Sequence, residues 1–327
     1  MNQNKNIDFI KTILAILVIV LHILPVNDKT FWINNGICRI AVPFFFFVSG
    51  YYSFKTLNKK ISFKKFLVFI SPYAMSFMIW MIIYSYYAYN KIYIHISYNN
   101  IYAYICKFFY IFFYKEGYFH LWYMLATIYG FIVIYLLKRI NINEKNITLL
   151  ALTCYLAGVL STTYANYLTS LNLLLSIIRY IGYPVTFAFP LLFIGYLVHK
   201  YEHSILKYCT NKIFICIIIL YCIEFILVWI KYTEHKYFDM YITHIILIPL
   251  LFIQAKNWNI PIINHISSRY ITCSGEMYFI HPLIISLLSL LNNNINIIFI
   301  IGVTFISSYI IHPYLYRLYR IFKQNGL

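Results

Sequence analysis

Acidic residues are scarce in this sequence, and charged residues of either sign are few. The 327 residues include only 9 Asp or Glu against 26 Lys or Arg, and charged residues together make up 11% of the chain, whereas 62% are hydrophobic. Soluble domains use roughly 45–50% apolar and about 25% charged residues. The scarcity of charge therefore excludes a soluble enzyme, and the high apolar fraction excludes a disordered or fibrous chain.

The signatures of several common enzyme and ligand sites are missing as well. The chain contains no G-x-S-x-G elbow, Walker loop, H-E-x-x-H zinc motif or glycine-rich nucleotide fingerprint. Its 7 cysteines include no C-x-x-C pair and are irregularly spaced, so we expect neither a disulfide framework nor a metal site. Basic and aromatic residues do not interleave in any soluble patch, so nucleic acid is not an expected partner.

Long apolar stretches recur along the chain, and about 17–25 such residues cross a bilayer as a helix. We predict one all-α domain over residues 1–327, a polytopic membrane helix bundle with ten transmembrane helices. The expected spans are 7–26, 37–57, 66–89, 119–137, 147–164, 177–198, 213–230, 239–255, 270–291 and 296–316. The aromatic-rich stretch 92–117 carries several charged residues, so we expect an interfacial or re-entrant helix there. The first stretch lacks a small-residue cleavage site, so we expect a retained span and not a signal peptide.

The distribution of basic residues predicts how the bundle is oriented. With the N-terminus in the cytoplasm, 18 of the 26 Lys and Arg fall in inner segments and 8 in outer segments. Basic residues concentrate in the cytoplasmic loops of membrane proteins. We therefore predict a multi-pass protein of the cell (cytoplasmic or inner) membrane, with both termini in the cytoplasm and the lipid bilayer as a partner.

Three ionisable residues of the first span form one polar stripe. Eleven residues at about 100° each bring Lys11 and His22 onto the same helix face, about 16 Å apart along the axis, and Asp8 lies one turn before Lys11. Ionisable groups inside the membrane usually line a cavity or a pathway. The alternative is a snorkelling Lys11 with a hydrogen-bonded packing His22, and the sequence leaves both interpretations open.

Polar side chains of other spans are expected at the outer level of His22. They are Arg39, His120, Trp122, Arg179, Asp239 and Tyr241. Each alone could be an interfacial side chain, and Trp122 is either an interface anchor or a pocket wall. Together they predict a polar cavity in the outer half of the membrane. Glu276 and His281, five residues apart in the ninth span, are further candidates for this lining.

Other residues at membrane positions have structural interpretations. Ser49 and Gly50 are expected to permit a close helix contact in the second span. Pro184 and Pro190 are expected to loosen the sixth span. Glu224 is interpreted either as a functional carboxyl group or as the acceptor of an interhelical hydrogen bond.

Several of these residues stand in motifs that resemble a known family. They are Asp8, Lys11 and His22 in the first span, then RIAVPFFFFVSGYY at 39–52, HLWYML at 120–125, FDMY at 238–241 and IHPL at 280–283. In this order they resemble the acyltransferase-3 family of integral membrane proteins, and especially the membrane domains attached to vancomycin-resistance serine racemases. The resemblance covers essentially the whole chain. Lys11 departs from it, because the family more often has arginine there, whose planar fork binds phosphate in a bidentate manner.

The resemblance implies transfer of an acyl group, often acetyl, from cytoplasmic acyl-CoA to a hydroxyl of an extracytoplasmic carbohydrate or similar acceptor. It implies His22 as the catalytic base, Arg39 as a cavity arginine, and Lys11 with Asp8 on the donor side. Acyl-CoA would be a cosubstrate, and no bound cofactor is expected. The 327 residues include no racemase domain, so we expect no racemase activity. The alternative function is a transporter or binding module for a small polar solute such as serine.

Overall fold

The computed structural model describes residues 4–25, 27, 29–58, 60–92, 120–182, 184–231, 238–258, 272–291 and 295–325. Over these ranges the regular structure is entirely helical. The α-helices are α1 (Lys5–Ile23), α2 (Phe31–Asn35), α3 (Ala41–Leu57), α4 (Phe63–Ile92), α6 (Trp122–Arg139), α7 (Glu144–Ser161), α8 (Asn172–Ile181), α9 (Phe189–Lys200), α10 (Glu202–Leu206), α11 (Asn211–Lys231), α12 (His244–Asn257), α15 (Ser274–Leu291) and α16 (Ile297–Asn325). Short 3₁₀ helices are η1 (Ile37–Ile40), η3 (Ala165–Tyr167) and η4 (Thr169–Leu171), and η5 (Pro184–Ala188) is a π-helix.

Many of these helices have the length and composition of membrane spans. Among the described residues, six segments meet both criteria: Lys5–Ile23, Phe31–Leu57, Phe63–Tyr84, Asn211–Ile230, Ser274–Leu291 and Ile297–Arg317. Helices α6, α7 and α12 occupy most of the expected spans 119–137, 147–164 and 239–255. They are shorter or less apolar than the six segments above and do not meet both criteria. The structure thus confirms an all-helical, multi-pass membrane protein. The number of ten spans and the cytoplasmic orientation of the termini stay predictions.

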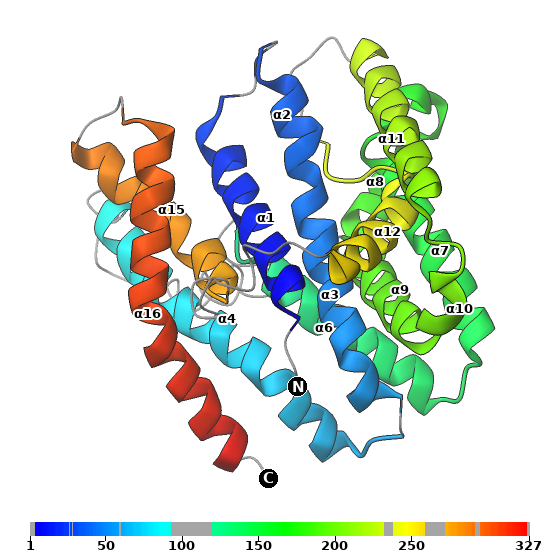
Figure 1. Cartoon of the computed structure of the whole chain (residues 1–327), viewed down its shortest axis with the longest axis horizontal. Helices are drawn as coiled ribbons and strands as arrows, with labels where there is room; N and C mark the ends of the chain where they lie inside the picture. The colour runs from blue at the N-terminus through cyan, green and yellow to red at the C-terminus, as the bar shows by residue number, and fades with distance from the viewer. Residues whose placement is uncertain are drawn as a thin grey trace.

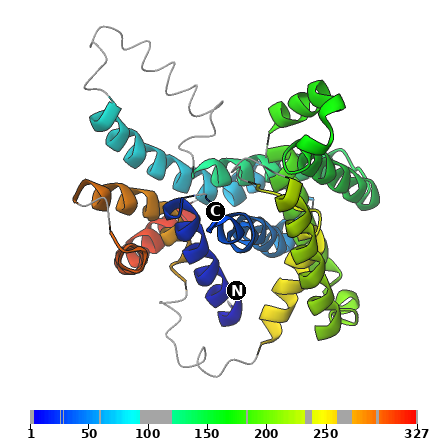
Figure 2. The same cartoon turned by 90° about the horizontal axis from the view of Figure 1, so that it is seen from above.

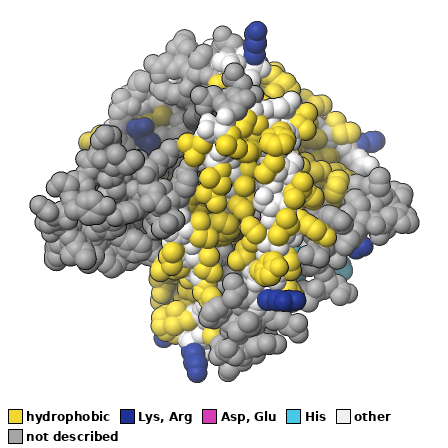
Figure 3. Space-filling model, turned by 90° about the vertical axis from the view of Figure 1, so that its left-hand side faces the viewer, with side chains coloured by type: hydrophobic (Ala, Val, Ile, Leu, Met, Phe, Trp, Pro, Cys, Tyr) yellow, Lys and Arg dark blue, Asp and Glu magenta, His cyan; other side chains and the backbone are white. Residues whose placement is uncertain are grey.

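The surface over α15 and α16 is predominantly hydrophobic, with Lys and Arg side chains at its edges (Figure 3). Leu291 at the end of α15 is 82% exposed, and Ile298 near the start of α16 is 77% exposed. Large apolar side chains gathered on one face are unfavourable in water and favourable against lipid chains. This face therefore fits contact with a bilayer. The interfacial helix expected at 92–117 lies outside the described residues, apart from Ile92 at the end of α4.

Helix α3 lies in the middle of the bundle, between α15 and α16 on one side and α11 and α12 on the other (Figure 2). It packs along α9 with almost no space between the two backbones. A Cβ atom added at Gly50 would lie 1.9 Å from the Leu192 carbonyl oxygen, and one added at Gly195 would lie 2.1 Å from the Phe47 carbonyl oxygen. Only glycine fits such an approach, so the close helix contact predicted at Gly50 is confirmed.

The prediction of a single continuous helix for the sixth span, at 177–198, is wrong. It is divided into α8 and a second segment, η5 with α9, which are bent by 82° relative to each other. Gly182 at the break has φ of 79°, a conformation that favours glycine. Pro184 follows, and it lacks the N–H that would continue the helix. The span is therefore broken between Gly182 and Pro184, a stronger effect than the loosening predicted from the sequence.

Helix α1 begins and helix α16 ends near the same end of the bundle (Figure 1). An ion pair between Glu202 and Lys256 joins α10 to α12 at this end. Tyr51 of α3 donates a hydrogen bond to Glu202 and accepts one from Lys256 Nζ at 2.8 Å. The Asn4 side chain donates to the Lys256 carbonyl oxygen at 3.2 Å, which brings in the start of α1. Four segments that are distant in sequence are therefore tied together by polar contacts.

The Glu202 contacts predict how stability depends on pH. Burial acts to raise the pKa of Glu202, but hydrogen bonds from Lys256 and Tyr51 and the Lys256 charge outweigh it, so the pKa lies below its ordinary value of 4.5. The pairing therefore stabilises the fold above that pH and is lost as the pH falls. We expect the melting temperature of Glu202→Gln to fall less between about pH 5 and about pH 3 than that of the wild type. Lys256→Met removes the other partner and should show the same weak dependence on pH as Glu202→Gln. An equal fall in melting temperature for the wild type and for these variants would contradict the role of this pair.

Candidate functional site

A cavity of about 430 Å³ lies beside the end of α1 that carries His22. Its lining includes His22, Arg39, Trp122, Phe187, Asp239 and Tyr278. These residues come from α1, η1, α6, η5, the segment before α12, and α15. The structure thus brings together four residues that the sequence predicted for a polar outer cavity: His22, Arg39, Trp122 and Asp239. We call it the outer cavity.

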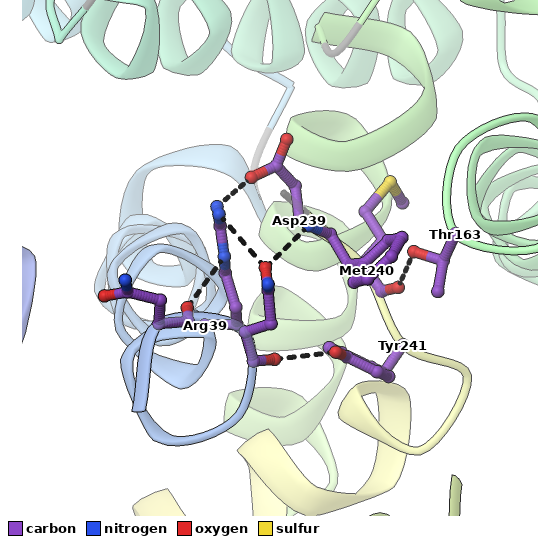
Figure 4. A network of polar contacts seen from close by, with 8 residues as sticks. Arg39, Thr163, Asp239, Met240 and Tyr241 are labelled. Atoms are coloured by element: carbon purple, nitrogen blue, oxygen red, sulfur yellow. Dashed lines mark hydrogen bonds and ion pairs between the residues drawn. The ribbon is translucent and has the colours of Figure 1, made fainter. Parts of the chain in front are cut away.

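Arg39 is fixed in the wall of the outer cavity by polar contacts (Figure 4). Its guanidinium forms an ion pair with Asp239, and its Nε donates to the Asn34 carbonyl oxygen at 3.1 Å. The Asn35 side-chain oxygen accepts a hydrogen bond from the Phe238 backbone N–H at 2.9 Å. The 3₁₀ turn that carries Arg39 is therefore joined to the segment that carries Asp239. A positive charge held in this way keeps its position in a weakly polar environment.

Tyr241 supports this arrangement from behind and does not line the outer cavity. Its hydroxyl donates to the Asn35 carbonyl oxygen at 2.6 Å, and its own carbonyl oxygen accepts from the Tyr155 hydroxyl at 2.8 Å. The side chain is completely buried. Tyr241 thus positions the turn before Arg39. The sequence predicted it as a cavity-lining residue, but among the residues that line the outer cavity it is absent.

Two further histidines are packed behind His22. The ring of His281 stacks on that of His22 with the centroids 5.1 Å apart, and the ring of His120 lies 5.9 Å from that of His281. His281 and His120 are both buried, and the His281 Nδ1 lies 3.2 Å from the Met277 carbonyl oxygen. Over the ranges that the structure describes, no group of three or more His, Cys, Asp or Glu is arranged to hold a metal ion. The stack therefore limits the orientations open to the His22 ring.

A second cavity, of about 420 Å³, lies toward the other end of α1 and is called the inner cavity. Its lining residues include Lys11 and Glu276 and eight that carry a hydroxyl group: Ser49, Tyr52, Tyr73, Ser76, Tyr123, Thr272, Ser274 and Tyr278. Lys11 Nζ lies 2.6 Å from Asp8 Oδ1, which confirms the pair expected one helical turn apart. Glu276 Oε1 lies 3.0 Å from His312 Nδ1 on α16. Glu276 was predicted with the outer group, but the structure places it in the inner cavity.

Tyr278 lines both cavities. Its hydroxyl donates to the His120 carbonyl oxygen at 2.6 Å, which fixes the ring between α15 and the start of α6. The sequence did not single out Tyr278, although it lies between Glu276 and His281, which were both candidates. A tyrosine in an aromatic-rich chain carries no signal of its own, and only the packing of α1, α3, α6 and α15 reveals its position.

Arg179 is not brought into the outer cavity. It lies exposed near the end of α8, and its Nε is 3.4 Å from the Leu175 carbonyl oxygen of the same helix. The break after α8 explains the difference, because the bend separates the direction of α8 from that of α9. A position extrapolated along one continuous helix is therefore incorrect for Arg179.

Glu224 has a structural role. Its carboxylate accepts hydrogen bonds from the Tyr164 hydroxyl at 2.7 Å and from the backbone N–H groups of Ile242 at 2.7 Å and Thr243 at 2.9 Å. Thr243 is the N-cap residue of α12 and Ile242 precedes it, so the carboxylate lies beside the N-terminal end of the helix, where a negative charge is favourable. The interhelical hydrogen-bond interpretation of Glu224 is therefore confirmed.

Comparison with known proteins gives a family for this arrangement. Residues 4–316 match the acyltransferase domain family. An amino-acid racemase of Enterococcus faecalis is 26% identical over 303 residues, which cover 87% of this chain and 41% of the racemase. A serine/alanine racemase of Enterococcus gallinarum is 42% identical over 59 residues, which cover 17% of this chain and 8% of that protein.

This chain therefore spans less than half the length of the curated relatives that it matches. No solved structure matches it. The family match, in contrast, extends over nearly all of the sequence, from before α1 into α16. The chain belongs to the acyltransferase-3 family of integral membrane proteins.

Proposed function

We propose that the protein moves an acyl group, acetyl as the first choice, from cytoplasmic acyl-CoA to a hydroxyl of an extracytoplasmic carbohydrate or similar acceptor, in the cytoplasmic membrane. One observation carries this proposal. The inner cavity with Lys11 and the outer cavity with His22 both reach Tyr278, and they follow the same face of α1. An acyl donor and an acyl acceptor that enter from opposite sides of the membrane would meet there.

The inner cavity suits the acyl donor. Its hydroxyl groups can bond to the amide groups of a pantetheine arm, and Lys11 lies on its wall. Asp8 balances the charge of Lys11, so attraction of the CoA phosphates relies on the wider excess of basic residues at the predicted cytoplasmic end. Lys11 and His22 are separated by about 16 Å of helix. A thioester at the end of an extended arm would therefore approach Tyr278 and His22.

The outer cavity suits the acceptor and the chemical step. A neutral His22 imidazole takes the proton of the acceptor hydroxyl as the oxygen attacks the thioester carbonyl carbon. The C–O bond forms, the C–S bond breaks, and the CoA thiolate recovers the proton from His22. Arg39, fixed by Asp239 and Asn34, supplies positive charge beside the oxygen on which negative charge develops. Trp122 and Phe187 form the apolar part of the acceptor wall.

The proposal is tested with the purified full chain in proteoliposomes. Acetyl-CoA labelled in the acetyl group is supplied on one side and a polysaccharide acceptor on the other, and free CoA thiol is measured together with label on the acceptor. We expect both signals, and Lys207→Gln, an exposed change away from the two cavities, should leave them unchanged. Accumulation of labelled serine inside the vesicles without release of CoA thiol would overturn the proposal in favour of a solute carrier.

Tyr278 is expected to limit the length of the acyl chain. Replacing it by alanine joins the inner and outer cavities, and one additional methylene in an apolar pocket is worth about 1–3 kcal/mol of discrimination. We expect the ratio of kcat/KM for acetyl-CoA to that for butyryl-CoA to fall about tenfold or more in Tyr278→Ala. Tyr278→Phe retains the ring and should retain the ratio. If both variants keep the wild-type ratio, Tyr278 does not limit the chain length.

A further inference from the structure

A third cavity, of about 360 Å³, lies where the α3–α4 loop meets the α6–α7 hairpin. None of its lining residues belongs to the inner or the outer cavity. Three cationic residues, Lys60, Lys138 and Arg139, and three amide residues, Asn58, Asn141 and Asn143, line it. The cavity therefore combines positive charge with several hydrogen-bonding groups, which is the chemistry that recognises a phosphate ester.

Two of the three cations of this basic cavity, Lys138 and Arg139, are held in place by neighbouring tyrosines. Arg139 donates to the Tyr135 hydroxyl at 2.8 Å. Lys138 donates to the Tyr196 hydroxyl and lies 4.2 Å from the centre of the Tyr196 ring. Positions fixed in this way lose less side-chain entropy when an anion binds.

Glu144 is the acidic residue among those that line the basic cavity, and its charge is already compensated. It forms an ion pair with Lys200 of α9 and accepts a hydrogen bond from the Tyr196 hydroxyl at 3.1 Å. These contacts hold the pKa of Glu144 below its ordinary value, although burial alone acts to raise it. The cavity therefore retains a positive balance.

Exposed apolar side chains are neighbours in the sequence of the residues that line this cavity. Leu136 is 50% exposed and Ile140 is 66% exposed on either side of Lys138 and Arg139, and Phe63, three residues after Lys60, is 55% exposed. Exposed apolar side chains next to Lys and Arg at a helix end fit the boundary between the lipid chains and the headgroups, because long basic side chains can reach the headgroups from there. A ligand here can place an anionic group in the basic cavity and hydrocarbon along the apolar surface.

We propose that the basic cavity binds the phosphate of an anionic phospholipid headgroup. Basic pockets between membrane helices are a recognised solution for such headgroups. Arg139 and Lys60 bind the phosphate, the amide groups bond to the polar part of the headgroup, and the acyl chains lie along Leu136, Ile140 and Phe63. A free phosphate or the phosphates of CoA would use the same cations but would gain nothing from the apolar surface.

The test uses the purified full chain in detergent, with binding of phosphatidylglycerol measured by native mass spectrometry and by the rise in melting temperature. Phosphatidylcholine, inorganic phosphate and CoA are separate arms. We expect phosphatidylglycerol to bind at least about tenfold more tightly than phosphatidylcholine, because only the former has a net negative headgroup. The variant Lys60→Gln/Arg139→Gln should lose this preference, and Arg139→Lys with Lys60 intact should keep part of it.

The matched control is Lys207→Gln/Lys212→Gln, which removes the same charge from exposed positions between α10 and the first turn of α11. An equal loss in this control would show that general attraction explains the binding, which would overturn the proposal. Equal binding of the two lipids would also overturn it. Displacement of phosphatidylglycerol by CoA or inorganic phosphate at similar concentration would assign the cavity to a soluble phosphate, again against a lipid site.

Discussion

Replacing His22 by alanine is expected to reduce acyl transfer by about 10²–10⁴-fold, the range that a positioned general base contributes. The loss should appear in kcat, because His22 lines the outer cavity and Lys11 lines the inner one, where the donor is proposed to bind. The KM for acetyl-CoA should change by less than about threefold, because uniform donor binding is not removed. Initial rates of CoA thiol release from the protein in proteoliposomes provide both constants.

His22 also stacks on His281, so alanine leaves space in the packing, and a loss of activity needs a structural control. His22→Gln retains most of the volume without a group that can act as a base at neutral pH. We expect it to be as inactive as His22→Ala while melting close to the wild type. His203→Ala, an exposed histidine of α10, is the matched control and should remain fully active. Turnover of His22→Gln within a few-fold of wild type would show that His22 is not the base.

Replacing Gly50 by alanine is expected to destabilise the fold by about 3 kcal/mol or more, at or above the upper end of what overpacking usually costs. The added Cβ would lie 1.9 Å from the Leu192 carbonyl oxygen and 2.6 Å from the Leu192 Cα. Both are backbone atoms, so no side-chain rotation relieves the contact and α3 and α9 must separate. Because α3 is the central helix, this separation affects both cavities.

The matched control is the same substitution at Gly302 in α16, where an added Cβ meets nothing within 4 Å. Gly302→Ala should be neutral or stabilising by about 0.5–1 kcal/mol, because alanine is the better helix former. Thermal melting in detergent and the yield of monodisperse protein measure the difference. Similar melting temperatures for the two variants would mean that α3 and α9 do not approach as closely as described.

The sequence predicts those parts of the site that depend on one helix or on one short connection. Lys11 and His22 share a face because the α-helix fixes their angular relation, and the Asp8–Lys11 pair follows from the same geometry. Arg39 comes near His22 because few residues separate the first two spans. Charge distribution and hydropathy predict a multi-pass helical protein, because every backbone polar group in lipid must be satisfied within a helix.

The remaining parts depend on packing between spans that are distant in the sequence. The stacking of His281 on His22 joins α15 to α1, and the contact of Tyr278 with His120 joins α15 to the start of α6. The periodicity of residues within one helix cannot predict these contacts between different helices. Arg179 shows a different failure, in which a backbone break at Gly182 redirects the chain and invalidates the helical extrapolation.

The shared wall at Tyr278 also affects how the membrane voltage acts on the reaction. In the proposed reaction the two cavities that share Tyr278 open to opposite sides of the membrane, so the layer of low dielectric between them is thinner than the roughly 30 Å of hydrocarbon around the protein. The voltage falls mainly across that thin layer, and a charge that crosses it exchanges about 2.3 kcal/mol with the field per 100 mV. An acetyl group carries no charge, while the phosphates of CoA stay on the donor side. In the proposed reaction the transferred group therefore passes the most strongly polarised part of the membrane without electrical work.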